Sequence, residues 1–246
     1  MCDDHALAHE LVQQAGRQLV DLRARPGWSS GAELGEAGDN SAHELLMTAL
    51  AEHRPGQAVL SEHGTSGTRV AGGRLWIVDP LDGTREFGEA GRSDWAVHVA
   101  LCEGGELLGA ISLPARGLVL GTGEPPRPPR GSGRTRVVVS RSRAPSWVPA
   151  LAAALDAEVH ALGSAGAKVA AVLLDEADVY VHSGGQHVWD SAAPVAVARA
   201  VGLHTSRLDG SPLVYDRADP WVPDLLVCRP DLAGRVLDEL ARAGAV

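Results

Sequence analysis

The residues best suited to chemistry are four acids, each of which stands at the expected end of a strand or helix. Asp79 and Asp82 follow the apolar run 75–78, and Glu62 follows another short apolar run. Asp190 stands far away in the sequence, at the start of a helical pattern. Carboxylates held close together repel one another, and a divalent cation removes the repulsion. Because no thiolate accompanies these acids, we expect Mg²⁺ or another hard cation.

Such a cluster could hold two cations, the usual apparatus for attacking a phosphorus atom with water. One ion lowers the pKa of the attacking water, and the shared charge neutralises the phosphate oxygens and the leaving alkoxide. The backbone N–H groups of Gly83 and Thr84, in the turn after Asp82, could bind the same phosphate. Thr84 could relay the proton of the water to Asp39, by pairing a hydroxyl with a carboxylate.

Each acid also has an ordinary structural explanation. Asp before Gly is common in turns, Asp39 and Asp190 could be helix N-caps, and Glu62 could be a solvated strand end. Three classes of protein therefore stay open. They are a phosphatase, a non-catalytic protein that binds a phosphorylated metabolite, and a scaffold whose acids serve only as caps.

The composition narrows the classes. A chain of 246 residues can form one large domain or two modest ones. A formal charge of −9, one Phe and two Tyr argue against a nucleic-acid partner. The three cysteines form neither a zinc pattern nor a disulfide framework. The N-terminus lacks the pattern of a signal peptide, and no apolar run approaches the ~20 residues of a membrane span. We therefore expect a cytoplasmic, soluble protein.

The first part of the chain reads as helices and antiparallel strands. An amphipathic pattern predicts a helix over 4–25. A Gly-rich polar stretch, 29–40, then reads as a loop, and a capping-box pattern at Ser41–Glu44 predicts a helix over about 42–53. Asp39 would stand just before that helix. Apolar runs and period-two alternation predict strands over 58–62, 75–78, 95–101, 107–113 and 117–120. We expect His98, within that alternation, to be a core histidine.

A Pro-rich linker at 124–133 divides the chain. It separates an N-terminal α+β half, 1–128, which carries the DPLDGT motif, from a C-terminal α/β half, 134–246. The second half alternates strands with helices, which predicts a layered α/β architecture. The strands are expected over 136–140, 158–162, 179–182 and 225–228, and the helices over 147–155, 163–175, 190–201 and 230–243.

Two motifs together resemble those of the inositol monophosphatase superfamily. They are residues 79–84 (DPLDGT), with Glu62 upstream, and residues 189–194 (WDSAAP). The resemblance covers most of the chain, with the motifs in the same order and at similar intervals. It implies the αβαβα sandwich of the sugar phosphatases and a Mg²⁺-dependent, lithium-sensitive phosphomonoesterase. A homodimer is compatible with this family.

Within the superfamily, residues 83–87 (GTREF) are similar to CysQ-type 3′(2′),5′-bisphosphate nucleotidases. So are residues 139–142 and the Gly163-Ser164 segment, although Lys168 comes one position late. The substrate implied is adenosine 3′,5′-bisphosphate, a by-product of sulfate assimilation, with AMP and phosphate as products. Its sulfated relative, 3′-phosphoadenylyl sulfate, is a second candidate. Inositol-1-phosphate and fructose-1,6-bisphosphate are the alternatives within the superfamily.

Carried over residue by residue, the resemblance implies three overlapping sets. The metal ligands would be Glu62, Asp79, the Leu81 carbonyl, Asp82 and Asp190. The catalytic residues would be Asp39, Thr84, Glu62 and Asp82. The substrate-binding residues would be Gly83, Thr84, Arg141, Ser164, Lys168 and Asp190. Lys168 could instead be a solvated helix residue.

His63 departs from the family pattern. The family usually has two consecutive acids where this chain has Glu62 and His63, and the second acid helps to hold a third ion. A histidine is a poor substitute for that role with a hard cation. We therefore expect two Mg²⁺ ions, and His63 puts a third in doubt.

Overall fold

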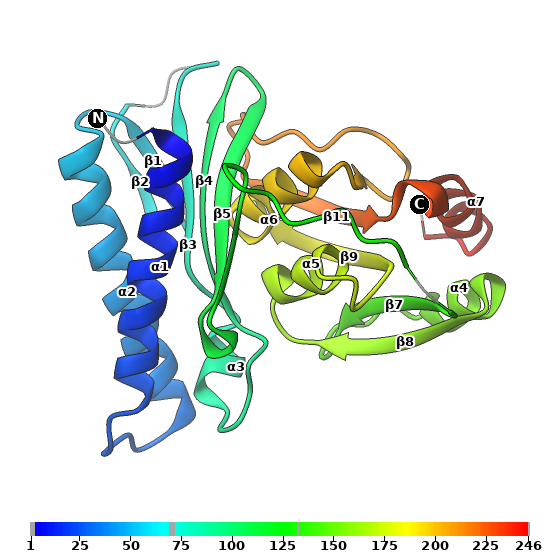
Figure 1. Ribbon diagram of the computed structural model, residues 1–246, viewed down its shortest axis with the longest axis horizontal. Coiled ribbons are helices and arrows are strands. Elements are labelled where there is room, and N and C mark those ends of the chain that lie inside the picture. Colours follow the sequence, from blue (N-terminus) through cyan, green and yellow to red (C-terminus); the bar gives the residue numbers. More distant parts are fainter. Residues whose placement is uncertain (1–2, 69–71, 132, 246) are drawn as a thin grey trace.

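The computed structural model describes residues 3–68, 72–131 and 133–245, which form two β-sheets and three layers of helices (Figure 1). The first sheet has six strands in the order β2-β1-β3-β4-β5-β6. All neighbouring pairs are antiparallel except β1 and β3. The strands are β1 (Ala58–Ser61), β2 (Gly64–Ser66), β3 (Leu75–Asp82), β4 (Ala96–Glu103), β5 (Glu106–Leu113) and β6 (Leu118–Gly121).

The second sheet has five strands in the order β10-β11-β9-β7-β8. Strand β7 runs parallel to β8 and β9, whereas β9, β11 and β10 pair antiparallel. The strands are β7 (Thr135–Ser140), β8 (Ala157–Leu162), β9 (Val179–His187), β10 (His204–Ser206) and β11 (Trp221–Cys228). The strands β2 and β10 were not predicted, and β9 extends beyond the predicted 179–182.

The helices form one outer layer, one shared inner layer and a second outer layer. Helices α1 (Asp4–Arg23) and α2 (Gly31–His53) cover one face of the first sheet, and α5 (Ala165–Leu173) and α6 (Val188–Val201) lie between the sheets (Figure 1). Helices α4 (Val148–Leu155) and α7 (Ala233–Arg242) cover the far face of the second sheet. The αβαβα sandwich is confirmed.

Strand β4 shows why the sheets are buried on both faces. Val97, Val99 and Leu101 pack in the core beneath α1 and α2, whereas Ala96 and Ala100 pack in the core around α5 and α6. The alternation in the sequence therefore separates large from small apolar residues rather than apolar from polar ones. His98 is buried in the same strand, so the prediction of a core histidine is confirmed.

The prediction for the second helix was wrong at its N-terminal end. Helix α2 begins at Gly31, after Ser30, whose side chain accepts a hydrogen bond from the Glu33 N–H. A Cβ at Gly35 would lie 2.9 Å from Thr84 Cγ2, and one at Gly38 would lie 2.6 Å from the Phe87 ring. These glycines allow α2 to lie close to α3 (Thr84–Gly88) and do not mark a loop.

The connection between the sheets runs from β6 to β7, and its residues 124–131 form no helix or strand. The helices that follow it, α5 and α6, pack against strands of the first sheet as well as the second. The division into 1–128 and 134–246 stays a prediction. The predicted closing helix starts later than expected, because a short 3₁₀ turn (Pro230–Leu232) precedes α7. Over the described ranges, no helix is both long and apolar enough to cross a bilayer.

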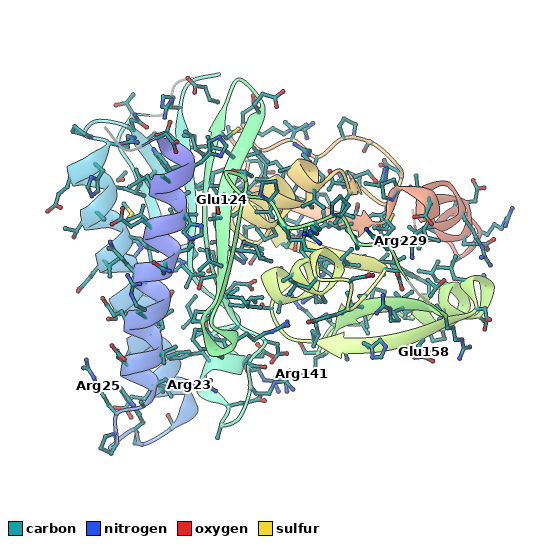
Figure 2. The ribbon with its side chains drawn as sticks, in the orientation of Figure 1. Arg23, Arg25, Glu124, Arg141, Glu158 and Arg229 are labelled. Carbon is teal, nitrogen blue, oxygen red and sulfur yellow. The ribbon has the colours of Figure 1, made fainter. Side chains whose placement is uncertain are left out.

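Asp178, just before the interior strand β9, joins the ends of three neighbouring strands of the second sheet. This carboxylate is buried and pairs with Arg136 at 3.0 Å and with Arg229 at 3.0 Å, the latter labelled in Figure 2. It also accepts a hydrogen bond from the Arg136 N–H at 2.8 Å. Burial opposes its ionisation, but the hydrogen bonds from both arginines outweigh burial and lower the pKa of Asp178.

Replacing Asp178 with Asn should lower the free energy of unfolding by about 3 kcal/mol at pH 7, because two partly buried arginines would lose their counter-charge. Urea unfolding measures this loss. Since the folded pKa is lowered, the stabilisation is present above the unfolded value of 3.8 and is lost as pH falls through the folded value. The matched control is Asp156→Asn, in an exposed Arg–Asp pair. Equal losses in the two variants would contradict the prediction.

Candidate active site

The irregular C-terminal end of β3, an interior strand of the first sheet, carries two carboxylates. The register with β4 shifts between Asp79 and Asp82, where Pro80 interrupts the ladder. The Leu81 N–H donates to Asp79 Oδ1 at 3.1 Å, which closes a tight turn. Asp79 is 3% exposed and Asp82 is 7% exposed. The chain therefore holds both acids in the interior.

The first turn of α5 fixes the Asp82 carboxylate. The N–H groups of Ala165 and Gly166 donate to its two oxygens at 3.2 and 2.6 Å. The Nε2 atom of His98 lies 3.3 Å from Oδ2, while its Nδ1 atom contacts the Trp189 carbonyl at 3.1 Å. A Cβ at Gly166 would overlap the His98 ring, so this approach requires glycine. The helix dipole of α5 thus stabilises a carboxylate of the protein.

The start of α6 brings in the distant acid. Asp190 is the third residue of α6 and accepts a hydrogen bond from the His187 N–H at 2.6 Å. Its carboxylate meets those of Asp79 and Asp82, with one oxygen from each of the three within 4.8 Å of the others. The sequence predicted that these acids of β3 and α6 meet, and the structure brings them together.

The cluster carries more negative charge than its surroundings compensate. Burial raises the pKa of Asp79 well above its usual value, and the charges of Asp82, Asp190 and Glu62 raise it further. Burial, followed by the Asp82 charge, raises the pKa of Asp190 to about 6. Oxygen-only ligands with unfavourable mutual repulsion are the donor set that a hard divalent cation fits. These residues therefore suit a metal ion.

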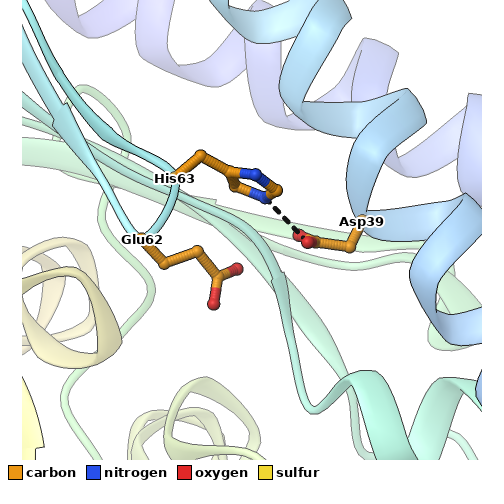
Figure 3. A group of neighbouring side chains, drawn as sticks. All are labelled: Asp39, Glu62 and His63. Atoms are coloured by element: carbon orange, nitrogen blue, oxygen red, sulfur yellow. Dashed lines mark hydrogen bonds and ion pairs between the residues drawn. The ribbon is translucent and has the colours of Figure 1, made fainter.

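A second group of possible ligands lies beside the first and comprises Asp39, Glu62 and His63 (Figure 3). One ligand atom from each lies within 4.8 Å of the others. Asp39 Oδ2 contacts His63 Nε2 at 2.7 Å, and the His63 ring stacks on His43. Desolvation of the carboxyl group, and then the Asp39 charge, raise the pKa of Glu62 to about 8.

The expected helix cap at Asp39 was wrong, because Asp39 lies in the interior of α2. Its hydrogen-bond partner is His63, whereas the Thr84 hydroxyl donates to the Leu81 carbonyl at 3.1 Å. Among the described residues, Asp39 Oδ1 is buried without a hydrogen-bond partner. A Thr84–Asp39 hydrogen bond is thus not formed in this structure, and the proton relay between them stays a prediction.

Both sheets contribute to a cavity of about 290 Å³ over the acids. Of the predicted site residues, those lining it are Glu62, Asp79, Leu81, Asp82, Gly83, Thr84, Ser164, Lys168 and Asp190. The sequence analysis did not identify a further polar group on its wall, which includes Ser142, Arg143, Tyr180, His182 and Gln186. These residues belong to β9 and to the loop after β7, and no motif in the sequence links the two segments.

Two predicted nucleotide contacts have structural partners of their own. Ser164 caps α5 by accepting a hydrogen bond from the Ala167 N–H at 3.0 Å. The Lys168 ammonium is buried and donates to the carbonyls of Gly163 and Ser164. Burial lowers the pKa of Lys168 to about 8. Lys168 is therefore not the solvated helix residue that was the alternative.

Arg141 differs most from its expected place. Its guanidinium binds Glu86 at 2.5 Å and Glu89 at 3.0 Å, beside α3 (Figure 2). It is absent from the described residues that line the cavity. In this structure Arg141 therefore ties the second sheet to α3, and its expected contact with a nucleotide stays a prediction.

Comparison with known proteins identifies the protein family to which the chain belongs. The chain matches the model of the inositol monophosphatase family over residues 5–125 and 129–243, and it belongs to that family. Its fold resembles that of inositol monophosphatase from Anabaena, with a TM-score of 0.78 at 21% identity, covering 97% of this chain and 95% of that one.

The names of similar proteins within the family also state a substrate. The chain is 45% identical to the 3′-phosphoadenosine 5′-phosphate phosphatase of Mycobacterium leprae, over 94% of this chain and 90% of that protein. It is 32% identical to the 3′(2′),5′-bisphosphate nucleotidase CysQ of Escherichia coli, over 73% of this chain and 78% of that one. Both names agree with the subfamily that the sequence motifs resemble.

Neutralising one acid should stabilise the metal-free protein. At pH 8 in EDTA, Asp190→Asn is expected to raise the free energy of unfolding, on the order of 2 kcal/mol, because a charge facing Asp82 is removed. Asparagine can still accept the hydrogen bond of the His187 N–H. Urea unfolding of the two proteins measures the difference.

The difference in stability between Asp190→Asn and the wild type should depend on pH. The folded pKa of Asp190 is raised to about 6 from 3.8, so its ionisation costs stability above 3.8 and costs most above about 6. The advantage of Asp190→Asn should therefore shrink as pH falls from 8 to about 4.5. A variant that is less stable than the wild type at pH 8 would show that the acids do not repel one another.

Proposed function

We propose that this protein is a Mg²⁺-dependent phosphomonoesterase that removes the 3′-phosphate of adenosine 3′,5′-bisphosphate and releases AMP and phosphate. The observation that carries the proposal is the convergence of three acids, two of them buried, Asp79, Asp82 and Asp190, within 4.8 Å. The family and the names of the relatives at 45% and 32% identity support the substrate. We extend the proposal to 3′-phosphoadenylyl sulfate, which carries the same 3′-phosphate.

The residues of the cluster would hold two ions. Asp79 and Asp82 supply buried carboxylates, Asp190 a partly buried one, Leu81 its carbonyl, and Glu62 an exposed carboxylate at the side of the cavity. When bound, Mg²⁺ supplies the positive charge that acidifies a water and neutralises the phosphate oxygens. Gly83 and Thr84 line the same cavity, where their N–H groups would orient the phosphate.

The side of the cavity near α2 would handle the proton of the water. Asp39 Oδ1 is buried without a hydrogen-bond partner among the described residues, and Glu62 lies beside it. The hydrogen bond from His63 fixes the other oxygen of Asp39. Thr84 would complete the relay by turning its O–H from the Leu81 carbonyl to Asp39, so that its oxygen accepts a proton from the water. Residues on α2 and α3 thus orient and deprotonate the nucleophile.

The number of metal ions that we propose depends on His63. His63 contacts Asp39 where the family usually has a second acid, so we propose two Mg²⁺ ions and no third. The homodimer and the cytoplasmic location predicted from the sequence stay predictions.

Phosphate release tests the proposal directly. The purified protein should release phosphate from adenosine 3′,5′-bisphosphate with Mg²⁺ and none when EDTA replaces Mg²⁺. Inositol-1-phosphate and fructose-1,6-bisphosphate, offered at equal concentration, should react at least about tenfold more slowly. Faster turnover of inositol phosphate would overturn the substrate, and no turnover of any substrate would favour a non-catalytic binding protein.

Asp82→Asn should abolish Mg²⁺-dependent phosphate release, with a loss in kcat of a hundredfold or more, because Asp82 would be one of the ligands that hold the ions. The fold should persist, since an asparagine side chain still accepts a hydrogen bond from the first turn of α5. Asp156→Asn, on the exposed surface, is the matched control and should keep the wild-type rate. Retention of the wild-type rate by Asp82→Asn would refute the metal assignment.

A further inference from the structure

The cavity over the acids contains polar groups that the proposed hydrolysis does not use. Tyr180 is 0% exposed and Gln186 is 5% exposed, and both line the cavity. The Tyr180 hydroxyl and the Gln186 Nε2 atom are buried without a hydrogen-bond partner in the described part of the chain. Buried polar groups are normally paired. Two unpaired groups on the wall of one cavity therefore indicate a polar ligand.

Arg143 supplies a cation to the same wall. Its backbone N–H donates to Ser140 Oγ at 3.2 Å, which fixes the loop after β7. Its guanidinium forms no ion pair with any residue that the structure describes, whereas Arg141 binds two glutamates and Lys168 binds two carbonyls. Arg143 can therefore bind an anion in the cavity without first losing a partner.

Arg143 lines the same cavity as the acid cluster, and its charge acts on other residues of the wall. Burial is the main cause of the lowered pKa of His182, and the charges of Lys168 and Arg143 lower it further. The cavity thus contains a carboxylate cluster, which suits cations, together with a guanidinium and two unpaired polar groups, which suit an anion.

We propose that Arg143, Gln186 and Tyr180 form a second anion subsite, which binds the 5′-phosphate while the 3′-phosphate lies at the acid cluster. This inference rests on the proposed function. The two phosphates of a 3′,5′-bisphosphate stand on either side of one ribose, so the second anion must lie one sugar ring away, within the same cavity. A guanidinium can bind a phosphate through two parallel hydrogen bonds, and the amide and hydroxyl can add neutral ones.

The test compares a substrate that has the second phosphate with one that lacks it. The kcat/KM for adenosine 3′,5′-bisphosphate, divided by that for 3′-AMP, is measured with Mg²⁺ for the wild type and for Arg143→Gln. The ratio should fall at least about tenfold, mainly through KM for the bisphosphate. Arg143→Lys should recover part of the ratio, and Gln186→Leu should lower it less. Arg134→Gln, at an exposed arginine that does not line the cavity, is the matched control and should leave the ratio unchanged.

The outcomes separate the subsite from the proposed function. If the wild type releases phosphate and Arg143→Gln leaves the ratio unchanged, the subsite is refuted while the proposed function stands. If the wild type releases no phosphate from the bisphosphate, both fail. If circular dichroism shows that Arg143→Gln does not fold, Gln186→Leu and Tyr180→Phe take its place, and an unchanged ratio in both refutes the subsite.

Discussion

Repulsion among Asp79, Asp82 and Asp190 is the constraint on which the rest of the structure depends. Buried carboxylates in contact are costly unless each finds a positive partner. The fold supplies partial compensation to Asp82, through two N–H groups at the start of α5 and the ring of His98. The charges of Asp79 and Asp190 receive less compensation, and both groups have raised pKa values. A cation bound among these acids would therefore raise the stability of the folded chain.

The layered architecture makes this concentration of charge possible. Helices α5 and α6 lie between the two sheets, and both begin at the site. Their N-termini carry partial positive charge and free N–H groups, which are the backbone features that stabilise a carboxylate. Strand β3 brings its acids to the same point from the first sheet. Acids more than a hundred residues apart thus meet where three layers converge.

The basic residues near the cavity differ in whether they already have partners within the protein. Lys168 and Arg141 are held by carbonyls and by glutamates, so they stabilise the junction between the sheets. Arg143 keeps its charge available. At the opposite side, His63 holds Asp39 by a hydrogen bond, where an acid would have added further repulsion. In the proposed function, the acids would hold the ions and Arg143 would hold the second phosphate within one cavity.

The sequence alone determined the layered class and the acids of the cluster, because both depend on local patterns. Apolar strands that end in carboxylates, and helices that alternate with strands, can be read over a few residues. The start of α2 could not be read in this way, because glycines such as Gly35 and Gly38 disfavour a helix. Their role in the helix becomes clear only from its close packing against α3. Tertiary structure likewise decided the partner of Asp39. It also decided which of Arg141 and Arg143 faces the cavity, because the glutamates that engage the first arginine lie more than fifty residues away in the chain.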